Sequence, residues 1–240
     1  ALLGTFSEHS VVPEYSLVKI DPGIPLHSAC LLSCGVLTGW GAAAKGAQVE
    51  PGDTVVVYGA GGVGLGAVQG ARICGARHVV AVDPVALKRE KALELGATHA
   101  VAGAQEAREL VKELTGGVGA DKAIVAVGVV NEEVVEEAVN IIRRAGTVAV
   151  AAAGERPGTK AIRVSAHVIC GGQKRNQGVT GGNLNIQYDT QRLLGLYRSG
   201  LLKLDEMLSK KYRLEDINQG YEDLLAGRII RGIIAFGDGA

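Results

Sequence analysis

The chain has 240 residues and equal numbers of basic and acidic side chains, 25 of each, so its formal net charge is zero. Hydrophobic residues make up 47% and charged residues 21%, which is typical of a globular protein and excludes a disordered or fibrous one. The balanced charge gives no indication of a nucleic-acid or membrane-surface partner. Four scattered cysteines are too few for a disulfide framework, so we expect reduced thiols in a soluble, cytoplasmic protein.

The first part of the chain has a mixed pattern. Residues 5–20 alternate loosely between polar and apolar, and the pairs 11–12 and 17–18 predict short strands separated by Pro13. Small and apolar residues dominate 26–48, which predicts buried helices interrupted near the glycines of that segment. In the uncharged stretch 22–44, Pro25, His27 and several glycines argue against a membrane span, as do six glycines in the stretch 54–71.

Residues 54–151 alternate between two kinds of segment. Short β-branched runs bounded by glycine or proline predict buried strands, and longer segments that end at glycine predict helices. The predicted strands are 54–58, 79–82, 99–101, 123–127 and 147–151, and the predicted helices are 63–74, 86–95, 106–114 and 132–143. Strands and helices that alternate at this spacing predict a parallel sheet with helices on both faces, an α/β doubly wound fold.

The pattern changes after about Gly182. Residues 190–197 and 215–225 predict amphipathic helices, and 229–236 predicts a closing strand. We find no strand–helix–strand rhythm in these last residues. We therefore expect them, together with the N-terminal segment, to be pieces of another domain.

The segment Gly59-Ala-Gly61-Gly-Val-Gly64 matches the G-x-G-x-x-G pattern of dinucleotide-binding Rossmann folds. It directly follows the predicted strand 54–58 and opens the next predicted helix. In this motif Gly59 permits a tight turn, Gly61 lets a pyrophosphate approach the backbone, and Gly64 allows close helix–strand packing. The free N–H groups of the helix N-terminus favour phosphate oxygens. The sequence therefore predicts a dinucleotide cofactor.

Asp83 ends the strand that follows the glycine motif. A carboxylate at this place accepts hydrogen bonds from the adenosine ribose diol and repels a 2′-phosphate. The sequence therefore favours NAD over NADP. The neighbouring Lys88 and Arg89 keep NADP open as an alternative.

The segment 32–41, which contains Cys34 and Thr38, resembles the zinc-dependent medium-chain alcohol dehydrogenases. Similar stretches occur throughout the chain, at 4–8, 51–53, 95–97 and 227–231. The resemblance implies a Rossmann cofactor domain flanked by remnants of a GroES-like catalytic domain. It implies domain bounds of 1–37 for the tail of the catalytic domain, 38–182 for the cofactor domain, and 183–240 for the return to the catalytic domain.

The resemblance also implies roles for individual residues. Cys34 would be a ligand of the catalytic zinc, and Thr38 would lie beside the nicotinamide. Asp83 and Lys88 would hold the adenosine ribose, and Arg231 would contact the pyrophosphate. The pyrophosphate cradle would consist of Gly59, Gly61, Gly62, Val63 and Gly64, and the nicotinamide half of the cleft would be lined by Val127, Gly128 and Val150.

The implied reaction is hydride transfer between an alcohol or aldehyde and the nicotinamide of NAD, with zinc as Lewis acid on the alcohol oxygen. The family's first domain supplies the other zinc ligands and the proton relay, so we expect this chain to be a fragment that is inactive alone. Cys30 and His27 are weaker candidates for a second ligand. Two alternatives remain: a non-catalytic NAD(H)-binding module, and a zinc-free quinone or enoyl reductase relative, against which Cys34 argues.

Residues 160–182 follow the last predicted strand of the sheet. In the resembled family this region pairs two cofactor domains edge to edge, and an exposed strand edge is a ready template for such pairing. We therefore expect a homodimer or larger homo-oligomer. The other expected partner is a small alcohol or aldehyde, with neither nucleic acid nor membrane.

Overall fold

The structure, a computed structural model, describes residues 4–152 and 162–237. The chain forms two compact units. The larger unit is Ser33–Leu184, and the smaller unit combines Ala1–Leu32 with Asn185–Ala240. The larger unit contains the glycine motif, so the architecture of this unit positions the candidate site.

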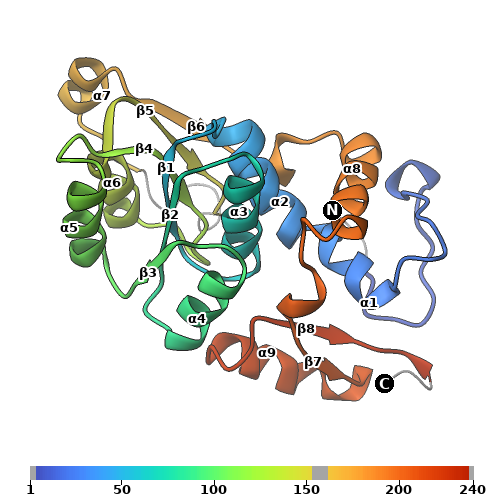
Figure 1. Cartoon of the computed structure of the whole chain (residues 1–240). Helices are drawn as coiled ribbons and strands as arrows, with labels where there is room; N and C mark the ends of the chain where they lie inside the picture. The colour runs from blue at the N-terminus through green and yellow to red at the C-terminus, as the bar shows by residue number, and fades with distance from the viewer. Residues whose placement is uncertain (1–3, 153–161, 238–240) are drawn as a thin grey trace. The chain divides into compact units, whose positions relative to one another are not determined.

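A six-stranded sheet with the order β3-β2-β1-β4-β5-β6 forms the centre of the larger unit (Figure 1). All of its pairings are parallel. The strands are β1 Thr54–Tyr58, β2 His78–Val82, β3 His99–Val101, β4 Ala120–Val125, β5 Ile142–Val150 and β6 Arg175–Gly178. Strand numbers fall from β3 to β1 and then rise from β4 to β6. The change of direction between β1 and β4 is the switch point of a doubly wound Rossmann sheet. The predicted fold class is confirmed.

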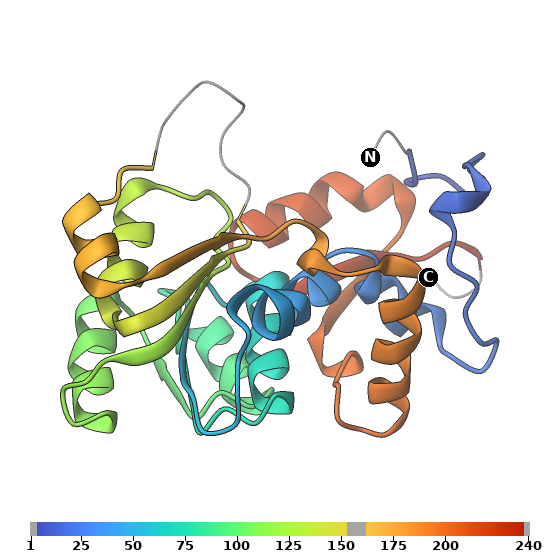
Figure 2. The same cartoon turned by 90° about the horizontal axis from the view of Figure 1, so that it is seen from above.

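Helices cover both faces of this sheet (Figure 2). Val56 and Val80 belong to a core that α5 and α6 cover on one face, whereas α3 contacts β1, β2 and β4. The helices are α2 Gly35–Gly41, the π-helix η3 Ala42–Ala47, α3 Gly62–Ile73, α4 Ala86–Glu94, α5 Ala104–Leu114, α6 Glu132–Ile141, α7 Ala166–Gly172 and the 3-10 turn η4 Gly181–Asn183. Every predicted element of 54–151 is present. The largest difference is at β5, which begins at Ile142 instead of 147, so the end of the helix predicted at 132–143 was wrong.

Helices α2 and α3 contact each other through their backbones. A Cβ built on Gly39 would lie 1.9 Å from the carbonyl oxygen of Val63, and one built on Gly66 would lie 2.7 Å from that of Val36. Both distances are too short for any side chain, so only glycine permits this packing. The segment that carries Thr38 is thereby held directly against the helix that begins at the glycine motif.

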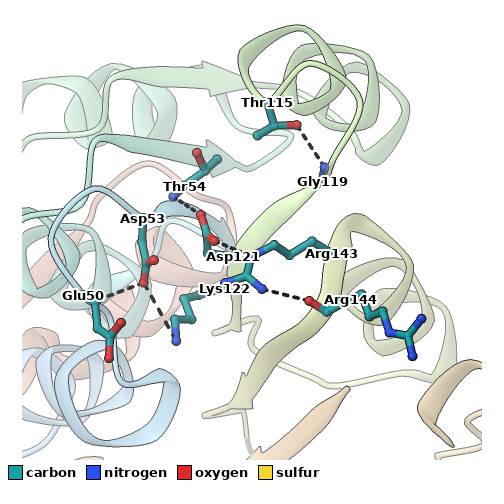
Figure 3. Close-up of polar contacts among 9 residues, drawn as sticks. All are labelled: Glu50, Asp53, Thr54, Thr115, Gly119, Asp121, Lys122, Arg143 and Arg144. Carbon is teal, nitrogen blue, oxygen red and sulfur yellow. Dashed lines mark hydrogen bonds and ion pairs between the residues drawn. The ribbon is translucent and has the colours of Figure 1, made fainter. Parts of the chain in front are cut away.

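Polar side chains join the N-terminal ends of three neighbouring strands (Figure 3). The Asp121 carboxylate on β4 accepts hydrogen bonds from the backbone N–H of Thr54 at 2.8 Å and from Arg143 Nε at 2.6 Å. Beside it, Lys122 Nζ lies 3.9 Å from Asp53 Oδ2, and burial raises the pKa of the Asp53 carboxyl above its ordinary value. In a parallel sheet this edge is opposite the edge that carries the glycine motif.

The smaller unit contains a strand–helix–strand unit of its own. Strands β7 Leu208–Tyr212 and β8 Arg231–Ile234 pair in parallel, and α9 Ile217–Leu225 lies between them in the chain. The prediction that the last residues lack this rhythm was therefore wrong. Three of the five residues of β7 are exposed, so the strand has no apolar run by which it could be recognised.

The remaining helices of the smaller unit are η1 Glu14–Ser16, α1 Leu26–Ala29, η2 Cys30–Ser33, α8 Ile186–Arg198, η5 Asp205–Met207 and η6 Leu214–Asp216. The short strands predicted at 11–12 and 17–18 were wrong: η1 is the regular element there in the described chain. The Gln187 and Gln191 side chains of α8 donate to the carbonyl oxygens of Leu17 and Lys19 at 2.8 and 2.6 Å. Amide side chains thus satisfy backbone groups that a sheet partner would otherwise satisfy.

No single helix in residues 4–152 and 162–237 has the length and hydropathy that a membrane crossing requires. The segments Leu26–Ser33 and Gly35–Ala47 reach those values only when they are joined across a bend.

Candidate cofactor site

The glycine turn connects β1 to α3. Gly59 has a φ of +88°, which side chains rarely adopt, and its N–H donates to the carbonyl oxygen of Val82 at 2.8 Å. A Cβ built on Gly64 would lie 1.7 Å from the carbonyl oxygen of Gly59. The fold itself therefore requires glycine at these two positions, as the sequence reasoning expected for the turn and for helix–strand packing.

Gly61 differs from both. Its φ of −77° suits any residue, and no atom of the described chain beyond its immediate neighbours lies within 4 Å of a Cβ built there. Gly61 is also the N-cap of the 12-residue helix α3, and no side chain caps that end in the described chain. The fold gives no reason for glycine at this position. Open space beside uncapped helix N–H groups is suited to the close approach of an anionic ligand.

Asp83 lies at the end of β2 and is only 5% exposed. Its Oδ2 accepts from the N–H of Ala60 at 2.8 Å, and its Oδ1 accepts from the N–H of Val85 at 2.9 Å. The carboxylate therefore ties the glycine turn to the loop before α4. Each carboxylate oxygen retains a second lone-pair direction with which it can accept a hydroxyl group.

Two basic residues of α4 follow Asp83. Arg89 Nη1 donates to the carbonyl oxygens of Asp83 and Pro84 at 2.9 and 2.8 Å. The side chain of Lys88 is half-buried and has no hydrogen bond or ion pair within the described residues. Sequence reasoning missed the contacts of Ala60 and Arg89 with Asp83, because they depend on how the β1 and β2 loops meet in space.

The C-terminal ends of β4 and β5 lie on the same sheet edge as the glycine turn. A Cβ built on Gly59 would lie 3.1 Å from the Cα of Val127, so these two segments are in contact. Gly128 is exposed, and no described atom beyond its neighbours lies within 4 Å of its Cβ position. Val127 and Val150 are half-buried and pack against the core below α5 and α6.

Cys34 precedes α2, and its φ of −148° and ψ of −67° separate η2 from that helix. Its side chain is exposed, whereas Thr38, one turn further on, is 8% exposed and donates its N–H to the Cys34 carbonyl oxygen. Within residues 4–152 and 162–237 no three His, Cys, Asp or Glu side chains are grouped so that they could hold a metal. A protein zinc site needs three or four protein donors, so the described residues do not fit a complete one around Cys34.

Arg231 belongs to the smaller unit, where it begins β8. It lines a cavity of about 240 Å³ together with Phe6 and Tyr221. Its contact with a pyrophosphate stays a prediction. The structure brings together the predicted phosphate residues Gly59, Gly61, Gly62, Val63 and Gly64 with Asp83. Lys88 lies on α4, and its contact with the ribose also stays a prediction.

The geometry defines a Rossmann unit with open space beside the uncapped N-terminus of α3. Comparison with known proteins gives the family: the zinc-binding dehydrogenases match residues 62–199. The chain is 50% identical over 233 residues to the NDMA-dependent alcohol dehydrogenase of Amycolatopsis methanolica, an alignment that covers 97% of this chain and 62% of that protein. The putative alcohol dehydrogenase D of Mycobacterium tuberculosis is 47% identical, with 97% and 63% covered.

Solved structures agree with this assignment. Benzyl alcohol dehydrogenase from Acinetobacter calcoaceticus superposes with a TM-score of 0.83 at 32% identity, over 91% of this chain and 59% of that one. The chain thus spans less than two thirds of the length of these relatives. It belongs to the zinc-binding dehydrogenase family, and the resemblance found in the sequence is confirmed.

Proposed function

We propose that the larger unit binds NAD(H), and that this chain is the cofactor-binding part of a zinc-dependent alcohol dehydrogenase. The main support for the proposal is the position of Gly61. The fold does not require glycine there, the residue lies at an uncapped helix N-terminus, and the buried Asp83 is bonded to the same turn. The names of the relatives support an alcohol or aldehyde as the substrate class. The intact enzyme would then transfer hydride between this substrate and the nicotinamide.

The proposed roles follow the geometry of the sheet edge. The backbone N–H groups of Gly61–Gly64 bind the pyrophosphate, since the dipole of α3 favours negative charge there. Asp83 accepts hydrogen bonds from the ribose diol, and Lys88 contributes a positive charge near it. We further propose that Arg231 adds a contact to the pyrophosphate in the intact enzyme.

The nicotinamide half is proposed to lie over the ends of β4 and β5. Bound NAD supplies a hydride acceptor there. Val127 and Val150 give that edge an apolar lining, Gly128 leaves room for the ring, and Thr38 orients it. Cys34 is proposed as a zinc ligand in the intact enzyme, where residues outside the described ones would have to complete the site.

We propose that the cofactor domain is 38–182, and that 1–37 and 183–240 belong to a GroES-like catalytic domain. The compactness of Ser33–Leu184 as a unit supports the assignment. A second candidate function is an NAD(H)-binding module that catalyses nothing itself.

Asp83→Asn tests the cofactor assignment. The parent chain is expected to bind NADH more tightly than NADPH, because the Asp83 carboxylate repels a 2′-phosphate. The variant loses this charge, so the ratio of the two dissociation constants should fall by about tenfold or more, a change of about 1.4 kcal/mol. Titrations of both cofactors, followed by NAD(P)H fluorescence, give the two constants.

Asp53→Asn is the matched control, because Asp53 is a similarly buried carboxylate at the opposite sheet edge. It should leave the NADH-to-NADPH ratio unchanged. A parent chain that binds NADPH as tightly as NADH would refute the role of Asp83.

A homodimer is proposed to form along β6, the last strand of the sheet. Its four residues are exposed, and its free edge can pair with a second copy. The N–H of Val179 donates to the carbonyl oxygen of Val150 on β5. Successive N–H groups of a strand point to opposite sides, so the N–H of Asn176 points to the free edge.

Light scattering should give twice the 24.8 kDa of one chain. Asn176→Pro, which removes that donor, should give the single mass, and a monomeric parent chain at high concentration would contradict the proposal.

The purified chain is expected to show no alcohol dehydrogenase turnover with NAD and added zinc, because the described residues offer Cys34 without a ligand cluster. A panel of primary and secondary alcohols should be assayed with and without NDMA, the compound named in one relative. Turnover that survives controls for contaminating enzyme and disappears in Cys34→Ala would show that a complete site exists.

A further inference from the structure

Two buried polar atoms, one on β1 and one on α6, have no hydrogen-bond partner in the described chain. Tyr58, the last residue of β1, is 3% exposed, and its hydroxyl oxygen has no hydrogen-bond partner in the described chain. Glu137 on α6 has its Oε2 equally enclosed and without a partner there. Its other oxygen, Oε1, accepts a hydrogen bond from Arg108 on α5 at 3.1 Å.

Tyr58 packs against the part of α6 that carries Glu137. Tyr58 belongs to the core that includes Val135 and Ala138, the neighbours of Glu137 on α6. Burial is the main cause that raises the pKa of Tyr58 above its ordinary value. The negative charge of Glu137 raises this pKa further, and the positive charge of Arg108 lowers it.

Packing does not explain the hydroxyl group. A phenylalanine would fill nearly the same volume without a polar atom in the core. Buried polar atoms in native proteins nearly always have a partner, because removing them from water without one is unfavourable. The Tyr58 hydroxyl and Oε2 of Glu137 therefore each require a hydrogen-bond partner that the described chain does not supply.

We propose that one ordered internal water molecule bridges the Tyr58 hydroxyl and Oε2 of Glu137. The water accepts a hydrogen bond from Tyr58 and donates one to the carboxylate, which satisfies both atoms. The same carboxylate also accepts the hydrogen bond from Arg108 on α5. The bridge ties the end of β1, immediately before Gly59, to both helices on that face of the sheet. It is independent of the proposed enzymatic function.

Crystal structures of the parent chain and of Tyr58→Phe, in one crystal form and at a resolution that shows waters, test the bridge directly. The parent should show a water within about 2.6–3.2 Å of both oxygens. Tyr58→Phe should lose or displace it. A direct bond between Tyr58 and Glu137, or an empty region between them, would overturn the proposal.

The sign of the change in melting temperature is a second readout. If the hydroxyl donates to a bridging water, Tyr58→Phe should lower Tm by about 2–4 °C. If the hydroxyl is simply unpaired, its removal should raise Tm, and that result would overturn the proposal. Glu137→Gln keeps the side-chain shape, and the Tm shifts of the two variants should not add in the double variant. Tyr188→Phe, at an exposed tyrosine, is the control that should leave Tm unchanged.

Discussion

Replacing Gly61 with alanine is expected to leave the fold intact and to weaken NADH binding by about 100-fold or more, equivalent to about 2.7 kcal/mol. The added methyl group meets no described atom beyond its neighbours, and the φ of −77° suits alanine. The methyl group does occupy the space through which a pyrophosphate would reach the N–H groups of α3. Circular dichroism and thermal melting measure the fold, and calorimetric titration measures the affinity.

Gly64→Ala is the matched control, three residues further along the same motif. Its Cβ would lie 1.7 Å from the carbonyl oxygen of Gly59, so β1 and α3 would have to move apart. We expect a loss of at least about 3 kcal/mol of folding stability, the upper range for overpacking. If Gly61→Ala bound NADH as tightly as the parent chain, the open space beside Gly61 would not be a cofactor site.

Removing the Asp121 carboxylate is the second change with a large expected effect. Asp121 joins β4 to the N–H of Thr54 and to Arg143, and Thr54 is only 5% exposed (Figure 3). Asp121→Ala leaves that buried N–H without its acceptor, and we expect a loss of about 2 kcal/mol. The ion pair with Arg143 adds little to this value because the guanidinium side chain is 38% exposed.

Thermal melting should show Asp121→Ala about 4–8 °C below the parent chain. Glu136→Ala removes an exposed carboxylate from α6 and should change stability by less than about 0.5 kcal/mol. Asp121 lies at the sheet edge opposite the glycine motif, so NADH affinity below the melting transition should not change. An unchanged Tm, or a loss of NADH affinity like that of Gly61→Ala, would contradict the role assigned to Asp121.

The larger unit could be predicted because its local signals agree with its tertiary packing. The β-branched residues of 54–58 are buried on both faces, as a central parallel strand requires. Gly96 follows α4 and has a φ of +113°. Glycine adopts such a positive φ readily, so the helix ends where the glycine predicted its end. In such segments the hydrophobic periodicity and the turn residues are enough to predict whether a helix or a strand forms and where it ends.

The smaller unit was harder to predict because its elements carry weaker patterns. Strand β7 is mostly exposed, so charged residues replace the apolar run of a buried strand. The backbone at Leu17 and Lys19 is satisfied by two glutamine side chains from α8, far along the chain. Contacts of this kind depend on tertiary structure and leave no periodic signal.

The site was partly predictable for the same reason. The roles of Gly59 and Gly64 follow from backbone geometry and close packing, which the motif encodes. The two backbone bonds of Asp83 and the approach of Gly39 to Val63 could not be foreseen, because each joins segments that meet only in the folded unit. The motif around Cys34 indicated a metal ligand, but it carried no information on whether other donors gather there.

Calorimetric titration of the 240-residue chain with NADH measures cofactor binding without the need for catalysis or zinc. We expect saturable binding of one NADH per chain. ADP-ribose should compete with it, because ADP-ribose carries the ribose and pyrophosphate groups assigned to Asp83 and α3. A folded chain that releases no binding heat and shows no change in NADH fluorescence at millimolar cofactor would contradict the proposal that the larger unit binds NAD(H).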